Sequence, residues 1–272
     1  MADTVAQTGV TPKLSLEGVT KVFTSNTQVV EAVQAITLHV AAGEFLCMVG
    51  SSGCGKTTLL NLIAGLEFPT TGKVLVDGKP VKGPGSDRMM MFQEHALFPW
   101  RSVIGNVLFG IEHQRQLNRK ERFERARHYL DMVQLSGFEK SRIHELSGGM
   151  RQRVALARAL TPEPDIILFD EPFGSLDALT RERFYAQIQE IFLRTKKTGV
   201  FVTHNVREAA CLGDRVVVLT SRPGRIKREI AVPLPRPRDF YDPDVSRLAG
   251  QILGELRSEL PPTGDTNHET EA

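Results

Sequence analysis

The chain has 272 residues, of which 41% are hydrophobic and 24% charged, and its formal net charge is +2. This composition is that of an ordinary globular protein, long enough for one large α/β domain or two smaller ones. The 34 basic and 32 acidic residues are nearly balanced. The net charge therefore does not predict a strongly basic surface that binds nucleic acid. No run reaches the roughly 18 apolar residues that a membrane span needs.

Cysteine usage and the first residues favour a cytosolic chain. Cys47, Cys54 and Cys211 are odd in number and lack metal-ligand spacing, so we expect neither disulfides nor structural zinc. No basic region followed by an apolar segment stands near Met1. We expect a flexible tail over residues 1–12.

The N-terminal part predicts an antiparallel sheet. Residues 14–19 and 36–40 show the period-2 alternation of half-buried strands. Phe23 falls in the loop expected between them, where its ring is a candidate for stacking on an adenine face. About as often, a Phe in such a loop fills core or surface.

A glycine-rich loop follows the apolar run 45–49 and precedes the apolar run 59–64. The loop is made of Gly50, Ser51, Ser52, Gly53, Cys54, Gly55, Lys56, Thr57 and Thr58. In a strand, loop and helix its N–H groups converge on a polyphosphate, aided by the helix N-terminus. Lys56 is expected to reach the terminal phosphates and the Thr57 hydroxyl to bind the accompanying Mg²⁺. This Walker A pattern predicts a nucleotide site.

Cys54 lies inside this loop at the helix N-terminus. Such an environment favours thiolate over thiol, and alkylation is then expected to block ATP binding. An equally weighted alternative is that Cys54 only fills a position for a small residue.

The next segment predicts short strands and then a helical insertion. Residues 88–92 have the pattern of a buried strand that ends at Gln93, a candidate to reach Mg²⁺ or water. Taken alone, Gln93 is more often a solvated loop residue. Helical patterns over residues 103–111 and 119–133 predict a helical subdomain at about residues 95–160.

A second anion-binding pattern opens the following helix. Ser147, Gly148 and Gly149 stand at its N-terminus, where backbone N–H groups and the helix dipole attract negative charge. The same three residues also suit an ordinary helix cap.

Two further strands are predicted to end in polar groups. The apolar run 166–169 leads to Asp170, suited to Mg²⁺, and Glu171, suited to activating water as general base. The strand 200–203 delivers His204, which in such a place holds the γ-phosphate or positions Glu171.

The order of these motifs resembles that of ATP-binding subunits of ABC transporters. The resemblance covers about residues 14–219 and rests on the Walker A loop, Gln93, the run 146–150, the pair Asp170 and Glu171, the turn 175–177 and His204. It implies an α/β fold: a P-loop NTPase core with a mostly parallel sheet, an N-terminal antiparallel β subdomain and an inserted α-helical subdomain.

The resemblance also implies cofactors and partners. ATP and Mg²⁺ are bound, with Gln93 near the metal and Asp177 near the nucleotide. Two copies pair head to tail, so that Ser147, Gly148 and Gly149 of one copy complete the site of the other. The implied partners are integral membrane permease subunits and, indirectly, a periplasmic or lipid-anchored solute-binding protein. The implied place is peripheral, at the cytoplasmic face of the inner membrane, without nucleic acid.

Within the family, residues 98–100 and 233–238 look like the branch that energises nitrate, sulfonate and taurine uptake. Met150 stands where Gln is commoner and Phe23 replaces the usual Tyr. Two other classes stay open: a soluble ABC-type ATPase that remodels a macromolecule, and a P-loop small-molecule kinase. The first lacks support because long coiled-coil insertions and a second cassette are missing, and the second leaves the 146–150 motif unexplained.

Residues 95–100, just after Gln93, are expected to form a docking loop for the permease. Leu97, Phe98 and Trp100 are large apolar groups that an isolated subunit has little reason to display. The alternative is that Phe98 and Trp100 pack inside the helical subdomain.

Beyond the ATPase domain, expected over residues 13–230, the segment 231–260 has its own character. Three prolines at 233, 235 and 237 predict an extended path from which Arg236 and Arg238 project. Asp242 and Pro243 then begin a helix whose apolar face is expected to pack on the chain's own ATPase domain. Residues 261–272 are expected to be disordered.

Overall fold

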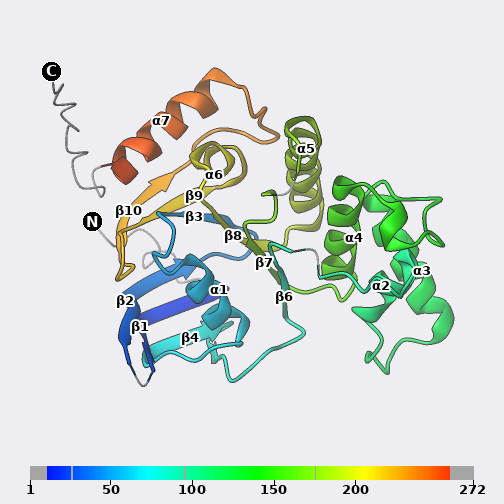
Figure 1. Cartoon of the computed structure of the whole chain (residues 1–272), viewed down its shortest axis with the longest axis horizontal. Coiled ribbons are helices and arrows are strands. Elements are labelled where there is room, and N and C mark those ends of the chain that lie inside the picture. Colours follow the sequence, from blue (N-terminus) through cyan, green and yellow to red (C-terminus); the bar gives the residue numbers. More distant parts are fainter. Residues whose placement is uncertain (1–10, 26, 95, 175, 258–272) are drawn as a thin grey trace, which may run out of the picture.

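The computed structural model describes residues 11–25, 27–94, 96–174 and 176–257. These form two β-sheets with helices against and between them, and a separate group of helices at one side (Figure 1). Most of the expected N-terminal tail, His95, Ser175 and the expected C-terminal tail lie outside the described residues. Among the described helices, none combines the length and apolarity needed to cross a bilayer.

The smaller sheet is antiparallel, as the sequence predicted. Its strand order is β2 (Val29–Val40), β1 (Leu14–Thr24), β4 (Thr71–Val76) and β5 (Lys79–Pro80). β1 and β2 are longer than the alternation indicated because register shifts interrupt their pairing and break the period-2 pattern.

The larger sheet is parallel in five of its six described strands. Its order is β10 (Ile226–Ala231), β9 (Arg215–Leu219), β3 (Phe45–Val49), β8 (Thr198–Thr203), β7 (Ile166–Asp170) and β6 (Arg88–Met91), and only β10 runs antiparallel. Every residue of β3, β7 and β8 is buried, which explains their continuous apolar sequences.

Alternate residues of the central strands supply two hydrophobic layers. Leu46 and Met48 of β3 join α1 (Lys56–Ala64) and the antiparallel sheet on one face. Phe45 and Cys47 join the layer on the other face, with α5 (Ala178–Thr195), α6 (Val206–Leu212) and the helical subdomain. The parallel sheet is therefore covered on both faces, as its burial requires.

The inserted helices follow β6 and precede β7 in the chain. They are α2 (Val103–Phe109), α3 (Arg119–Met132), a 3₁₀ turn (Ile143–Glu145) and α4 (Gly148–Leu160), and they group at the right of Figure 1. A capping box fixes the start of α3, because Asn118 accepts from the Glu121 backbone and Glu121 accepts from the Asn118 backbone. The predicted helical insertion is confirmed.

The C-terminal segment packs back against α6 and β9. We call residues 232–241 the strap; they run from β10 to α7 (Pro243–Arg257). Val245, Leu248 and Ile252 of α7 are buried in the same layer as α6, so the expected packing on the chain's own domain is confirmed. Asp242 accepts from the backbone N–H of Asp244 at 2.7 Å and begins the helix as predicted.

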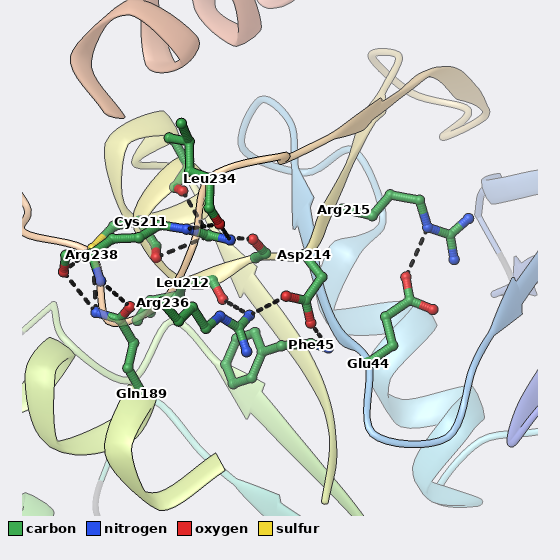
Figure 2. A network of polar contacts seen from close by, with 12 residues as sticks. Glu44, Phe45, Gln189, Cys211, Leu212, Asp214, Arg215, Leu234, Arg236 and Arg238 are labelled. Atoms are coloured by element: carbon green, nitrogen blue, oxygen red, sulfur yellow. Dashed lines mark hydrogen bonds and ion pairs between the residues drawn. The ribbon is translucent and has the colours of Figure 1, made fainter. Parts of the chain in front are cut away.

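The sequence analysis expected Arg236 and Arg238 to project from the strap. In the structure, both side chains turn inward instead. Arg238 is only 8% exposed and donates to the carbonyl oxygens of Ala210, Cys211 and Gly213 at the end of α6 (Figure 2). Arg236 donates to Asp214 Oδ1 at 3.0 Å, as the same view shows. Carbonyl groups at a helix C-terminus lack helical partners, so they attract the guanidinium groups inward.

Candidate active site

The glycine loop leaves β3 and enters α1 with a conformation that only glycine adopts easily. Gly55 precedes α1 with φ 98°, and a Cβ there would lie 2.5 Å from Val33 Cγ1 and 2.8 Å from the Ala32 carbonyl oxygen. The loop is therefore pressed against β2 at this glycine. This is the local structure that the Walker A pattern predicted.

Lys56 is buried at the base of this loop. Its Nζ donates to the carbonyl oxygens of Gly50 at 2.9 Å and Ser51 at 3.1 Å, and its side chain is 6% exposed. The Nζ also lies 3.9 Å from Glu171 Oε1. The loop thus holds the ammonium group in place with its own backbone.

Thr57 and Asp170 meet at the end of the central strands. The Thr57 hydroxyl donates to Asp170 Oδ1 at 3.1 Å. Burial raises the pKa of Asp170, and the charge of Glu171 adds to this, while the Thr57 bond and Lys56 oppose it. The described residues contain no group of three or more His, Cys, Asp or Glu that could hold a metal by themselves. One hydroxyl and one carboxylate suit Mg²⁺, which takes its other oxygens from phosphates and water.

Glu171 and His204 form a pair beside this site. His204 Nδ1 lies 2.8 Å from Glu171 Oε2. β7 and β8 are neighbours, and the Glu171 N–H donates to the Val202 carbonyl at 3.1 Å, so the adjacency follows from the sheet. Glu171 has φ 43°, a left-handed conformation that is uncommon for a non-glycine residue and recurs at functional sites.

Two other predicted site residues make no described hydrogen bond to this cluster. Gln93 follows β6 and is exposed, and no described hydrogen bond joins it to Thr57 or Asp170. Ser147 caps α4 and accepts from the Met150 N–H at 3.3 Å. Figure 1 shows α4 well separated from α1, and no described hydrogen bond joins Ser147 to the phosphate loop of its own chain.

Gly149 of this run lies against the start of α5. A Cβ at Gly149 would come within 2.3 Å of Thr180 Cγ2, so a glycine is needed for the approach. Asp177 caps α5 by accepting from the Thr180 N–H at 2.9 Å. Hydrogen bonds from the Thr180 backbone lower the pKa of Asp177, which keeps it ionised.

Phe23 lies on β1 and not in the loop where the sequence analysis placed it. It pairs with Val30 of β2, and the register shifts of this strand pair hid the strand from the alternation pattern. The ring is 39% exposed, with Lys21 Nζ 4.8 Å from its centroid. It remains a candidate for base stacking.

Cys54 differs from the expectation of a thiolate. Its side chain is 1% exposed, and burial raises the pKa of the thiol, while Lys56 opposes the rise. Desolvation therefore outweighs the positive end of α1. The alternative, a small residue filling a small space, fits the structure.

The β9 to β10 loop touches the phosphate loop, which the sequence analysis missed. Arg222 Nε donates to the Gly53 carbonyl at 3.2 Å. The Gly224 N–H donates to the Ala32 carbonyl at 3.0 Å, which joins the same loop to β2. The run of Arg, Pro and Gly from 222 to 224 signals a turn, but nothing local tells which distant segment it contacts.

The fold and the loop at Lys56 define a P-loop nucleoside triphosphatase. A family model described as ABC transporter matches residues 33–174. An uncharacterised ABC transporter ATP-binding protein of Methanocaldococcus jannaschii is 50% identical over 248 residues, which cover 91% of this chain and 92% of the relative. The chain belongs to the ABC transporter family, as an ATP-binding and ATP-hydrolysing subunit.

Two named relatives and one solved structure extend this comparison. The nitrate import ATP-binding protein NrtD of Synechocystis is 48% identical, over 95% of this chain and 98% of its own length. The taurine import ATP-binding protein TauB of Burkholderia pseudomallei is 48% identical, over 79% and 82%. The dimeric post-hydrolysis structure of the cassette MJ0796 with ADP and Pi has a TM-score of 0.72 and 31% identity, covering 82% of this chain and all of that one.

Proposed function

We propose that this subunit hydrolyses ATP to energise import of a small anion, such as nitrate, a sulfonate or taurine, through a membrane permease. The observation that carries the ATPase mechanism is the pairing of Glu171 with His204 beside the contact of Thr57 with Asp170. The import direction and the anion are supported by the nitrate and taurine relatives. The subunit acts peripherally, at the cytoplasmic face of the inner membrane.

The phosphate loop, residues 50–58, binds the triphosphate with its N–H groups and the N-terminus of α1. When ATP enters, Lys56 exchanges the Gly50 and Ser51 carbonyls for β- and γ-phosphate oxygens. Thr57 and Asp170 would hold Mg²⁺, and the side-chain oxygen of Gln93 would be a further ligand. When bound, Mg²⁺ would neutralise charge on the phosphates. Phe23 stacks on the base.

Glu171 removes the proton from the attacking water. An Nδ1–H of His204 donates to Glu171 Oε2, which orients the carboxylate and leaves Nε2 directed to the γ-phosphate. Lys56 stabilises negative charge that develops on the phosphoryl group.

A second copy of the chain completes the site. Ser147, Gly148 and Gly149 stand at the N-terminus of α4, whose N–H groups suit contact with the γ-phosphate bound to a partner. Asp177 lies at the start of α5 beside this run and takes part in the same interface. We propose a head-to-tail homodimer with two shared sites.

The permease docks on the aromatic groups that follow Gln93. Trp100 is 70% exposed, and the Phe98 ring lies 5.4 Å from it and 4.6 Å from Phe109. A partly exposed aromatic cluster next to a nucleotide-sensing loop suits a short permease helix. A periplasmic or lipid-anchored binding protein delivers the anion to the outer side of the permease.

Glu171→Gln tests the proposed chemistry. The variant keeps ATP affinity and loses hydrolysis by a factor of about 10² or more, since the amide cannot accept the proton. Glu163→Gln, at an exposed carboxylate paired with Arg125, is the matched control and retains turnover. Cells with Glu171→Gln lose uptake of labelled nitrate or taurine, while Glu163→Gln cells keep it. Normal turnover of purified Glu171→Gln protein would contradict the role of Glu171, and unchanged uptake of both anions would contradict the cargo.

A further inference from the structure

Both chain neighbours of His204 are fixed by one buried carboxylate. The Thr203 hydroxyl donates to Glu208 Oε2, and the Asn205 N–H donates to the Thr203 hydroxyl at 2.9 Å. The Asn205 side chain in turn accepts from the N–H groups of Arg207 and Glu208, at 3.0 and 3.4 Å, and caps α6. The backbone at His204 therefore depends on where Glu208 lies.

Glu208 is itself held from α5. The Tyr185 hydroxyl donates to Glu208 Oε1 at 2.7 Å, and both side chains are buried, at 2% and 6% exposure. No described ion pair involves Glu208, and its direct side-chain partners are two hydroxyl groups. Without these bonds, the ionised form of a buried carboxylate would be strongly destabilised.

The strap covers the other side of Tyr185. The rings of Tyr185 and Phe240 are stacked, with centroids 4.9 Å apart and planes at 25°. Arg207 of α6 lies over the Phe240 ring at 5.5 Å. Two residues earlier in the strap, Arg238 is bound to the end of α6 (Figure 2). Phe240 is therefore held in place and limits the movement of Tyr185.

We propose that Tyr185 and Glu208 are positioning residues for His204, and that Phe240 of the strap holds Tyr185 in the orientation this requires. The inference rests on the proposed roles of His204 and Glu171. A hydrogen-bonded pair such as His204 and Glu171 works only within a narrow range of geometry, which supporting contacts must fix. The strap thereby affects hydrolysis indirectly, through the contact of Phe240 with Tyr185.

Tyr185→Phe tests the proposal, because it removes the hydroxyl and keeps the stacked ring. We expect kcat for ATP hydrolysis to fall roughly tenfold with an unchanged KM for ATP, as loss of a bond to a charged group predicts. Tyr129→Phe is the matched control, since Tyr129 is also buried and donates to a carboxylate, Glu163, in the helical subdomain. This control keeps wild-type kcat and KM.

The pH profile separates positioning from a general loss of structure. Burial raises the pKa of Glu208, and the bonds from Thr203 and Tyr185 lower it, as do charges on Arg181 of α5 and on His204. The thiols that face it, Cys47 of β3 and Cys211 of α6, have raised pKa values and stay neutral. Losing the Tyr185 bond raises the pKa of Glu208 further, so the acid limb of the kcat profile moves to higher pH. Tyr129→Phe leaves that limb in place.

Two further variants complete the test. Phe240→Leu keeps the Tyr185 hydroxyl but removes the stack, and we expect the same fall in kcat at constant KM, by a smaller factor. Glu208→Gln keeps the size of the side chain and is also expected to lower kcat at constant KM. This variant tests the proposal if either aromatic variant fails to fold. Wild-type kcat and pH profile in folded Tyr185→Phe, while Glu171→Gln is inactive, would overturn the positioning role alone. Activity in Glu171→Gln would instead overturn the proposed hydrolysis mechanism.

Discussion

Arg238 is the side chain through which the strap is predicted to stabilise the protein. Its guanidinium donates to three carbonyl groups at the end of α6, those of Ala210, Cys211 and Gly213, and to Leu234 of the strap (Figure 2). Gln189 of α5 binds both backbone groups of Arg238, accepting at 2.7 Å and donating at 2.9 Å. Arg238→Met keeps the length of the aliphatic part and removes every one of the guanidinium bonds.

The magnitude follows from the number of acceptors left without a partner. A buried acceptor that loses its donor is destabilised by about 1–3 kcal/mol. The carbonyl groups at the end of α6 have no helical donors, so at least two of them lose their stabilisation together. We expect the free energy of unfolding to fall by about 2–6 kcal/mol, since each of two such acceptors costs about 1–3 kcal/mol.

Urea unfolding followed by far-UV circular dichroism measures this change. The midpoint falls at an unchanged m-value if the folded state keeps its extent of burial. Arg228→Met, at an exposed residue of β10, is the matched control and changes stability by no more than about 0.5 kcal/mol. Arg238→Lys gives an intermediate loss, since one ammonium group cannot reach both sets of carbonyls. A loss below about 1 kcal/mol in Arg238→Met would refute the reasoning.

Three other predictions concern the site and its partners. Alkylation of Cys54 in the folded protein is slow at neutral pH and accelerates only well above it, because burial raises the pKa of the thiol; rapid labelling at pH 7 would contradict this. Ser52→Cys and Ser147→Cys in one chain crosslink between chains when ATP is present, and crosslinks only within a chain would contradict the head-to-tail dimer. Leu97→Ala with Phe98→Ala leaves ATP binding intact and weakens permease association by a few kcal/mol, on the order expected for buried interface aromatics; unchanged uptake would place the docking surface elsewhere.

The central fold was predictable because its signals are local. Each buried strand contains a continuous apolar run. Asp170 ends β7, His204 directly follows β8, and Lys56 follows β3 after the glycine loop. Parallel neighbours end at one edge of a sheet, so these groups were expected to meet. The contacts of Thr57 with Asp170 and of Glu171 with His204 join residues from different motifs that sequence reasoning had already singled out.

Sequence reasoning failed where a distant segment decides the environment. The prolines of the strap restrict the backbone, but they do not set the direction of the side chains between them. Arg238 therefore turns inward to carbonyl groups of α6, which the sequence did not predict. Cys54 looked activated because its place at a helix N-terminus is visible in the sequence, whereas its burial is not. The contact of Arg222 with Gly53 joins residues 169 positions apart. No sequence pattern near either residue predicts this contact.

The dependence of His204 on distant contacts follows from the length of α6. This helix spans only Val206–Leu212, and so short a helix is not stable by itself in water. Its first turn is fixed by the Asn205 cap and by the bonds of Glu208, and its last turn by Arg238. Because His204 immediately precedes α6, any shift of this helix moves the imidazole relative to Glu171. The strap binds the far end of the same helix, so stability and hydrolysis are coupled through one short element.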